Sequence, residues 1–263
     1  MSNKCTKNNH YVSIGFAKNF RTQKSDMWKL DCISGDITNR STSAERLFAG
    51  RKLWSQDLED AYNTLENQVI PLIDEILLLP FKPVASSNAV EIEVLPDKYK
   101  KVLDYILQTT ILQRANTPKS KEVDEEIHSK FFSSELVLPV EKIYLIRYNQ
   151  IAFKKTPLVL IDNCVSAVPT PKVNNTPLEY SLAFIIPISP FNCLFFGNRK
   201  QLDFFAPKHI NPHNLNIYRI LQENKQCQIA SQNKEYLEIL KSEYQHHNLS
   251  SAITVFSQRN YIW

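Results

Sequence analysis

The sequence predicts an α+β fold, in which an N-terminal β-hairpin and a helical region pack with a C-terminal mixed or antiparallel sheet and short helices. Apolar residues recur at helical spacing within residues 44–132, whereas short strand-like runs dominate residues 136–263. With 43% hydrophobic residues the chain can build a sizeable core. No long Gly/Ser linker separates the two parts, so we expect residues 1–263 to form a single domain that shares one core.

The N-terminal part is expected to contain a hairpin and then a long helix. Residues 26–32 alternate apolar and polar side chains, Ser34-Gly35-Asp36 is typical of a turn, and residues 37–42 are rich in Thr, Ser and Asn. Residues 44–79 are expected to form a helix, in which the apolar side chains from Leu58 to Ile76 recur at i, i+3, i+4 and i+7 and predict one buried stripe. Pro71 should kink this helix or split it near residue 70.

A second long helix is expected from Asp97, which can cap it, to about residue 115. Thr117-Pro118 should end it, and a charged helix is expected over residues 119–132. The β-rich part is expected to contain strands at 142–147, 151–153, 157–162, 180–187 and 193–197, short helices near 213–224 and 233–244, and a strand at 252–257.

Composition excludes several kinds of site. Four glycines in 263 residues argue against a glycine-rich phosphate loop or a dinucleotide-binding fingerprint, and no cofactor is predicted. The net charge of +4 does not demand a nucleic-acid partner but is compatible with one if the basic residues cluster. No apolar run reaches the ~18–20 residues of a membrane span, so no membrane partner is predicted. The most apolar stretch, residues 182–196, is broken by prolines and should form two buried strands.

The five cysteines lie far apart and form no CxxC pair, so the sequence indicates neither a zinc knuckle nor a disulfide framework. Cys164 and Cys193 are expected to be buried small hydrophobes. Residues 1–9 are polar and lack the apolar region of a signal peptide. Reduced, scattered thiols together with this N-terminus predict a cytoplasmic location.

Residues 10–20, His-Tyr-Val-Ser-Ile-Gly-Phe-Ala-Lys-Asn-Phe, form the most informative block of the chain. If the block is helical after Ser13, Phe16 and Phe20 share one face and should anchor the N-terminus in the core. His10 can titrate near neutrality, so it could be a general acid or base. It could equally be a hydrogen-bonded histidine with a purely structural role.

This block resembles the opening signature His-Tyr-Val-Pro-Gln-Phe-Tyr-Leu-Arg-Asn-Phe of a large, mostly bacterial family, the domain of unknown function numbered 4238. Shorter resemblances follow in the same order: Trp28-Lys29-Leu30-Asp31, the Leu-Glu pairs at 58–59 and 65–66, Gln113-Arg114-Ala115-Asn116-Thr117-Pro118, Asp162-Asn163-Cys164-Val165, Ile186-Pro187-Ile188-Ser189-Pro190 and the Asn-rich stretch 211–216.

The chain departs from the family's pattern at three positions. Ser13 and Cys164 stand where the pattern has proline, and Lys18 stands where it has arginine. Because lysine lacks the planar bidentate contact of arginine, a role for Lys18 in gripping phosphate or carboxylate is weakened. The family has no established activity, so the resemblance supports the fold and the single domain rather than a function.

Three polar residues joined to apolar elements are the candidates for catalysis: His10, Arg114 and Asp162. Arg114 lies near a helix end, where it could bind a phosphate or carboxylate, or pair with the terminal carbonyls of its own helix. Asp162 follows an apolar strand, where it could orient His10, activate water or bind a cation. The alternative for Asp162 is an Asx turn with Asn163.

Five further residues are expected to contribute to ligand binding: Tyr11, Lys18, Asn19, Asn163 and Glu66. Glu66 shares a helix face with Glu59, where paired carboxylates can hold a divalent cation or simply form a solvated edge. No metal site is predicted. His209 and His213 are four residues apart, but Asn211 and Pro212 indicate a helix start between them, so a zinc-binding pair on one continuous helix is not expected.

Two hypotheses follow. In the first, the chain is an intracellular bacterial enzyme that acts on nucleic acid or a nucleotide phosphate, such as an RNase-like toxin or an anti-phage defence protein. Arg114 then holds a phosphate while His10 and Asp162 move protons. In the second, the chain is a non-catalytic module that binds a protein or a ligand, and the same residues form a structural polar network. Both hypotheses leave room for a protein partner or a homo-oligomer.

Overall fold

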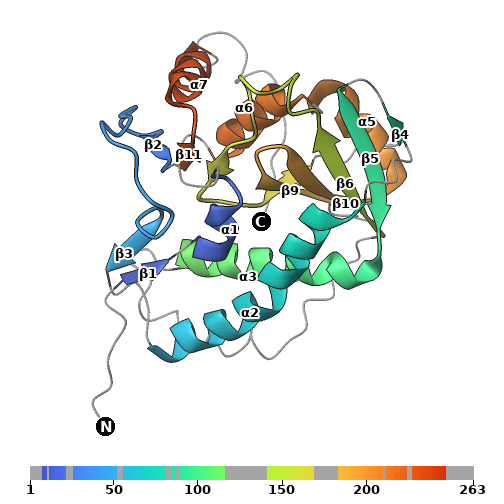
Figure 1. The fold of residues 1–263 in the computed structure, drawn as a ribbon, viewed down its shortest axis with the longest axis horizontal. Coiled ribbons are helices and arrows are strands. Elements are labelled where there is room, and N and C mark those ends of the chain that lie inside the picture. Colours follow the sequence, from blue (N-terminus) through green and yellow to red (C-terminus); the bar gives the residue numbers. More distant parts are fainter. Residues whose placement is uncertain are drawn as a thin grey trace, which may run out of the picture.

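The computed structural model describes residues 8–10, 12–21, 26–51, 56–80, 85–86, 89–115, 141–168, 183–209, 211–223 and 227–246. The predicted α+β class is confirmed, because helices pack against sheets in which every described strand pair is antiparallel (Figure 1). The expected helix at 119–132 and the expected strand at 252–257 lie outside the described residues.

A six-stranded sheet forms the centre of the described fold. In spatial order its strands are β4 (Ala85–Ser86), β5 (Val90–Leu95), β6 (Lys142–Tyr148), β10 (Asn192–Gly197), β9 (Ala183–Ser189) and β8 (Ser166–Val168). All seven residues of β9 are buried, as are five of the six in β10. The two buried strands expected within residues 182–196 are therefore confirmed.

Helices cover both faces of this sheet. On one face lie α2 (Gln56–Leu78) and α3 (Lys100–Ala115), and on the other α5 (Arg199–His209) and α6 (Pro212–Gln222) (Figure 1). Side chains alternate between faces along a strand. From β6, Arg147 accordingly reaches the carbonyls of Ile76 and Leu79 near the end of α2. On the other face, Tyr144 makes an edge-on ring contact with Phe195, which packs against Phe205 of α5.

The N-terminal block is helical where the sequence predicts it. In α1 (Ile14–Lys18) the Ser13 hydroxyl accepts the N–H of Phe16 at 3.2 Å and so caps the helix. Phe16 and Phe20 are both buried, with ring centroids 5.8 Å apart. The expectation that these two aromatics anchor the block in the core is confirmed.

The helix expected from residue 44 begins only at Gln56. Before it the chain forms β3 (Ala49–Arg51), which pairs with β1 (Asn8–His10). The helix then runs through Pro71 without a break, so of the two alternatives expected there the split is wrong, and the kink stays a prediction. Pro71 and Asn67 are both exposed, so water can replace the hydrogen bond that the proline cannot donate.

The apolar stripes of α2 and α3 pack against each other, as the periodicity predicts. Val69, Ile73 and Ile76 of α2 are buried, as are Val102 and Ile106 of α3. Asp97 is the first residue of a short 3-10 helix, η1 (Asp97–Tyr99), that leads into α3, rather than its cap. The side chains of Leu58 and Ile111 lie outside the described residues.

A smaller sheet lies beside the first, in the order β2 (Trp28–Asp31), β11 (Gln228–Ser231) and β7 (Leu160–Ile161). Helix α7 (Lys234–His246) packs on β2 and β11 over a second apolar cluster. The predicted turn after β2 forms, with Gly35 at φ +73° and a bridge between Leu30 and Ile37. The main partner of β2 is nevertheless β11, a strand that the sequence did not reveal.

Of the shorter elements predicted in the C-terminal part, two helices are confirmed and one strand is wrong. The helices expected near 213–224 and 233–244 are confirmed as α6 and α7. Residues 151–153 form a turn instead of a strand, because the Asn149 side chain accepts the N–H groups of Ile151 and Ala152. Ile151 is 91% exposed there.

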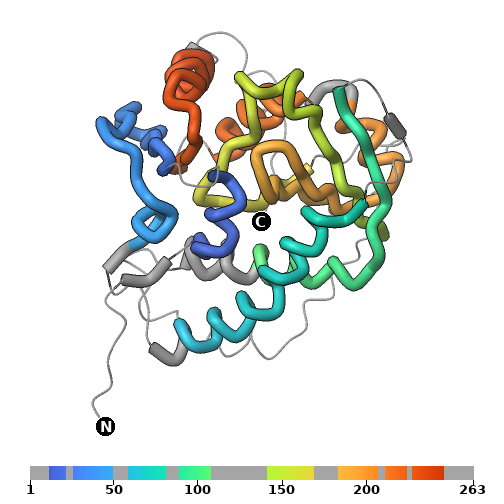
Figure 2. The backbone as a smooth tube through the Cα atoms, viewed as in Figure 1, coloured from blue at the N-terminus to red at the C-terminus, as the bar shows by residue number. Residues whose placement is uncertain are grey.

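One cluster of buried side chains includes Phe16 of α1, Ile73 of α2, Leu103 of α3 and Phe196 of β10, so both parts of the chain contribute to it. Figure 2 follows the same backbone as a tube, from α1 (blue) near the N-terminus to α7 (red). Within the described residues, no helix is long and apolar enough to cross a membrane.

Candidate functional site

Asp162 lies directly after β7, as predicted. Its Oδ2 accepts the main-chain N–H of Gln228 at 3.0 Å, and its Oδ1 accepts that of Asn163 at 2.9 Å. The second bond runs to the next residue, one short of the i+2 N–H that defines an Asx turn. Burial raises the pKa of the Asp162 carboxyl to about 6, against the lowering effect of these hydrogen bonds. This carboxyl can therefore gain or lose a proton close to neutral pH.

Asn163 links Asp162 to a second carboxyl group. Its side-chain Nδ2 donates to Oε1 of Glu223, the residue that caps the C-terminus of α6. The charge of Glu223 is a further cause of the raised pKa of Asp162. The side-chain Oδ1 of Asn163 is buried and has no hydrogen-bond partner among the described residues. Asp162, Asn163 and Glu223 thus form a polar cluster, hereafter the carboxyl cluster, whose three residues are all partly exposed.

Arg219 of α6 lies behind the carboxyl cluster and is only 1% exposed. Its guanidinium donates to the Ser166 hydroxyl at 3.3 Å and to the carbonyls of Val159, Asn163 and Cys164 at 3.1, 3.2 and 3.4 Å. Burial lowers the pKa of this guanidinium. With its donors engaged by the main chain, Arg219 fixes the segment that carries Asp162 and does not present itself to a ligand.

A cation contacts Gln228, the residue whose main-chain N–H binds Asp162. Lys29 of β2 donates from Nζ to the side-chain Oε1 of Gln228 at 3.3 Å, and the N–H of Gln228 holds Asp162. Lys29 is half-buried. Gln228 therefore binds Asp162 through its main chain and Lys29 through its side chain.

Glu66 is engaged by the N-terminal block. The hydroxyl of Ser13 donates to Glu66 Oε1, so Ser13 both caps α1 and ties it to α2. Burial raises the pKa of Tyr105 on α3, and the charges of Glu66 and of Cys164 add to that shift. The predicted ligand-binding residue Glu66 and the segment after β7 therefore belong to one neighbourhood, although the contacts of Glu66 are structural.

The other predicted site residues are less engaged. Lys18 is exposed, and Asn19 is half-buried with an Nδ2 that has no partner within the described residues. Tyr11 lies outside the described residues. His10 belongs to β1 and Arg114 to α3, but their side chains also lie outside the described residues. The convergence of His10 and Arg114 on Asp162 stays a prediction.

Within the described residues, no third metal-ligating side chain joins Glu59 and Glu66. Across the described ranges, no group of three or more His, Cys, Asp or Glu side chains could hold a metal ion. His209 ends α5 and Pro212 begins α6 behind the N-cap Asn211, so His209 and His213 belong to separate helices, as predicted. Cys164 and Cys193 are buried, also as predicted.

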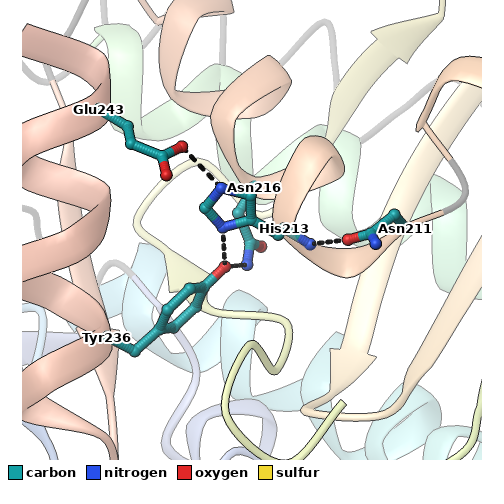
Figure 3. Close-up of polar contacts among 5 residues, drawn as sticks. All are labelled: Asn211, His213, Asn216, Tyr236 and Glu243. Atoms are coloured by element: carbon teal, nitrogen blue, oxygen red, sulfur yellow. Dashed lines mark hydrogen bonds and ion pairs between the residues drawn. The ribbon is translucent and has the colours of Figure 1, made fainter. Parts of the chain in front are cut away.

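A second polar network, missed by the sequence reasoning, joins α6 to α7 (Figure 3). His213 Nδ1 lies 3.1 Å from the Tyr236 hydroxyl, and His213 Nε2 lies 2.6 Å from Glu243 Oε2. Asn216 donates to the same hydroxyl at 2.9 Å and to the carbonyl of Pro157 at 2.8 Å. We call these four side chains, His213, Asn216, Tyr236 and Glu243, the histidine relay.

With a neutral imidazole, each donor in the histidine relay faces an acceptor. Asn216 then donates to Tyr236, Tyr236 donates to Nδ1 of His213, and Nε2–H of His213 donates to Glu243. Both ring nitrogens are thereby occupied, and Tyr236 is fully buried. The Oδ1 atom of Asn216 also accepts the N–H of Val159 at 3.2 Å. The relay thus holds the approach to β7 in place and offers no ring nitrogen to a substrate.

Comparison with known proteins does not identify a family: no family model, no curated protein and no solved structure matches the chain. The resemblance to the domain of unknown function numbered 4238 therefore rests on the short motifs alone.

Proposed function

We propose that the chain is an enzyme that acts on a nucleic acid or a nucleotide phosphate, with Asp162 as a proton-transferring group. One observation carries the proposal: the carboxyl cluster combines two partly exposed acidic side chains, bridged by Asn163, at the end of a buried strand. A carboxyl whose pKa is about 6 can exchange a proton close to neutral pH, as a general acid or base must. Perturbed carboxyl pairs of this kind are a frequent mark of catalytic sites.

The anionic substrate is supported by the chemistry around the cluster. Lys29 supplies a cation that contacts the side chain of Gln228, and the main-chain N–H of Gln228 holds Asp162. In its protonated form, Asp162 also removes the negative charge that would repel a phosphate. His10 and Arg114 remain the proposed partners, the first as the second proton-transferring group and the second as a phosphate contact. We place this activity in the bacterial cytoplasm, as the motif resemblance and the cysteine pattern suggest.

The test compares Asp162→Asn with the wild type on labelled single-stranded RNA, single-stranded DNA and nucleoside triphosphates. The matched control is Asp74→Asn, because Asp74 is exposed on α2, away from the cluster. We expect Asp162→Asn to lose ~10²–10⁴-fold in rate per folded molecule, as positioned acid–base groups do. The control should keep wild-type activity. The proposal fails if the wild type processes none of these substrates, or if folded Asp162→Asn is as active as the wild type.

A second candidate is the non-catalytic binding module, and a specific observation favours it. Arg219 and the histidine relay donate chiefly within the chain and to its main-chain carbonyls, as a structural polar network does. For such a module, Asp162→Asn changes the free energy of unfolding and no enzymatic rate exists to change. The same pair of variants therefore separates the two candidates.

A further inference from the structure

Cys32 and Cys227 lie opposite each other, Cys32 directly after the end of β2 and Cys227 directly before the start of β11. The register joins Asp31 to Gln228, so the next facing pair is Cys32 and Cys227, and the N–H of Cys32 donates to the carbonyl of Cys227 at 3.0 Å. Their two Sγ atoms are 3.5 Å apart. A disulfide needs the sulfurs about 1.5 Å closer.

We propose that Cys32 and Cys227 are a redox-active dithiol that closes to a disulfide when a peroxide or a low-molecular-weight disulfide oxidises it. With a small disulfide, one protein thiolate attacks it and releases a thiol, and the second protein thiolate then displaces the other thiol. Two protein thiols and one small disulfide give one protein disulfide and two small thiols. With hydrogen peroxide, a sulfenic acid and water form first, and the second thiol displaces a second water.

The other described thiols are placed differently. Cys164 Sγ faces the carbonyl of Ile161 at 3.6 Å, and Cys193 Sγ faces that of Leu194 at 3.6 Å. Within the described chain, Cys32 and Cys227 are therefore the pair whose sulfurs are in contact. Geometry therefore decides which of the described cysteines can form a disulfide, since the bond needs two sulfurs within reach of each other.

The surroundings of Cys32 and Cys227 set the rate at which the two thiols are oxidised. Cys32 and Cys227 are 5% and 2% exposed, and the contact with Cys32 together with burial raises the pKa of the Cys227 thiol. The reactive form is the thiolate, so oxidation should be slow at neutral pH and faster at alkaline pH. A dithiol of this kind responds to sustained oxidation rather than to a brief pulse.

The bond would join two residues 195 positions apart. It would also fix the start of β11, where the N–H of Gln228 holds Asp162. Cross-linking distant residues restricts the unfolded chain, so the oxidised form should resist unfolding more than the reduced form. None of this depends on whether the carboxyl cluster is catalytic.

The experiment oxidises the reduced full-length chain with glutathione disulfide and, separately, with hydrogen peroxide, followed by alkylation and peptide mapping without reductant. We expect the free thiols to fall from five to three per chain, with one linked peptide pair containing Cys32 and Cys227. The urea midpoint of unfolding should rise and return to its original value after dithiothreitol. Cys32→Ser should lose the link, and Cys164→Ser, the matched buried control, should keep it.

The wild-type peptide map keeps the test decisive even if a variant does not fold. The proposal is overturned if Cys32 and Cys227 can both still be alkylated after oxidation of the folded wild type. It is also overturned if the disulfide joins either of them to another cysteine. A stable glutathione adduct on one of the two, with no second displacement, would overturn it as well.

Discussion

The guanidinium of Arg219 donates to the main-chain carbonyl of Asn163 at 3.2 Å, and so a buried cation of α6 holds the residue next to Asp162. The same side chain reaches the carbonyls of Val159 and Cys164 on either side. One arginine therefore fixes the position of the carboxyl cluster relative to α6, which also leads into Glu223.

Replacing Arg219 should show how much stability this anchoring provides. Arg219→Met leaves several buried carbonyls without donors, at a cost of ~1–3 kcal/mol each, partly offset because a charge no longer has to be buried. We expect a net loss of about 2–4 kcal/mol in the free energy of unfolding, measured with urea. The control Arg199→Met removes an exposed ion pair to Asp203 and should cost less than about 1 kcal/mol. Equal losses in both variants would contradict the anchoring role.

Phe20 should carry much of the attachment of the N-terminal block. It is 2% exposed and packs on Phe16, so Phe20→Ala should destabilise the chain by ~3–5 kcal/mol. Phe204 on α5 is 40% exposed and is the matched control, with an expected loss below about 1 kcal/mol. If Phe20→Ala unfolds at the same urea concentration as Phe204→Ala, the block does not anchor the chain.

The Tyr236 hydroxyl should stabilise the junction of α6, α7 and the approach to β7. Tyr236→Phe removes the acceptor of Asn216 and the partner of His213 Nδ1 inside a buried site. We expect a loss of about 1–3 kcal/mol, the usual cost of leaving buried polar groups unpaired. Paired with His213→Gln in a double-mutant cycle, it should show a coupling above ~0.5 kcal/mol. Strict additivity of the two losses would mean that the contact is not energetically linked.

Asp162 should make stability fall as pH rises through the acidic range. Its pKa is raised from 3.8 to about 6 on folding, so between these values the folded chain keeps a proton that the unfolded chain has released. The stabilisation is complete below pH 3.8 and is lost as pH passes 6, with an amplitude of about 3 kcal/mol. We expect the wild type to lose most of that amount relative to Asp162→Asn between pH 4 and 7 in urea titrations. Parallel curves for the two proteins would contradict the raised pKa.

Much of the fold could be predicted because its signals are local. The stripes of α2 and α3 and the pair of apolar runs that form β9 and β10 repeat over enough residues to decide between helix and strand. The start of α2 was misplaced because residues 44–55 also have helical spacing, and the pairing of β3 with β1 is a long-range contact. Strand β11 has four residues, too few for any period to show.

The candidate site was predicted in part. Asp162 and Asn163 could be located because polar residues follow an apolar run, whereas their partners Glu223 and Gln228 come from distant stretches. One local signal was available for Arg219. It lies four residues after Leu215, and so it falls on the apolar stripe of α6, where an unpaired charge is too costly to be accidental. The contact of Cys32 with Cys227 had no local signal, because it depends on the register of β2 and β11.

The central claim is that Asp162 transfers a proton during catalysis and that Glu223 helps to set its pKa. The most direct test is the pH dependence of kcat/KM for RNA cleavage by the wild type and by Glu223→Gln, which can still accept the hydrogen bond from Asn163. We expect an inflection near pH 6 in the wild type and at lower pH in Glu223→Gln, because the charge of Glu223 raises the pKa of Asp162. An inflection at the same pH in both proteins would contradict the claim.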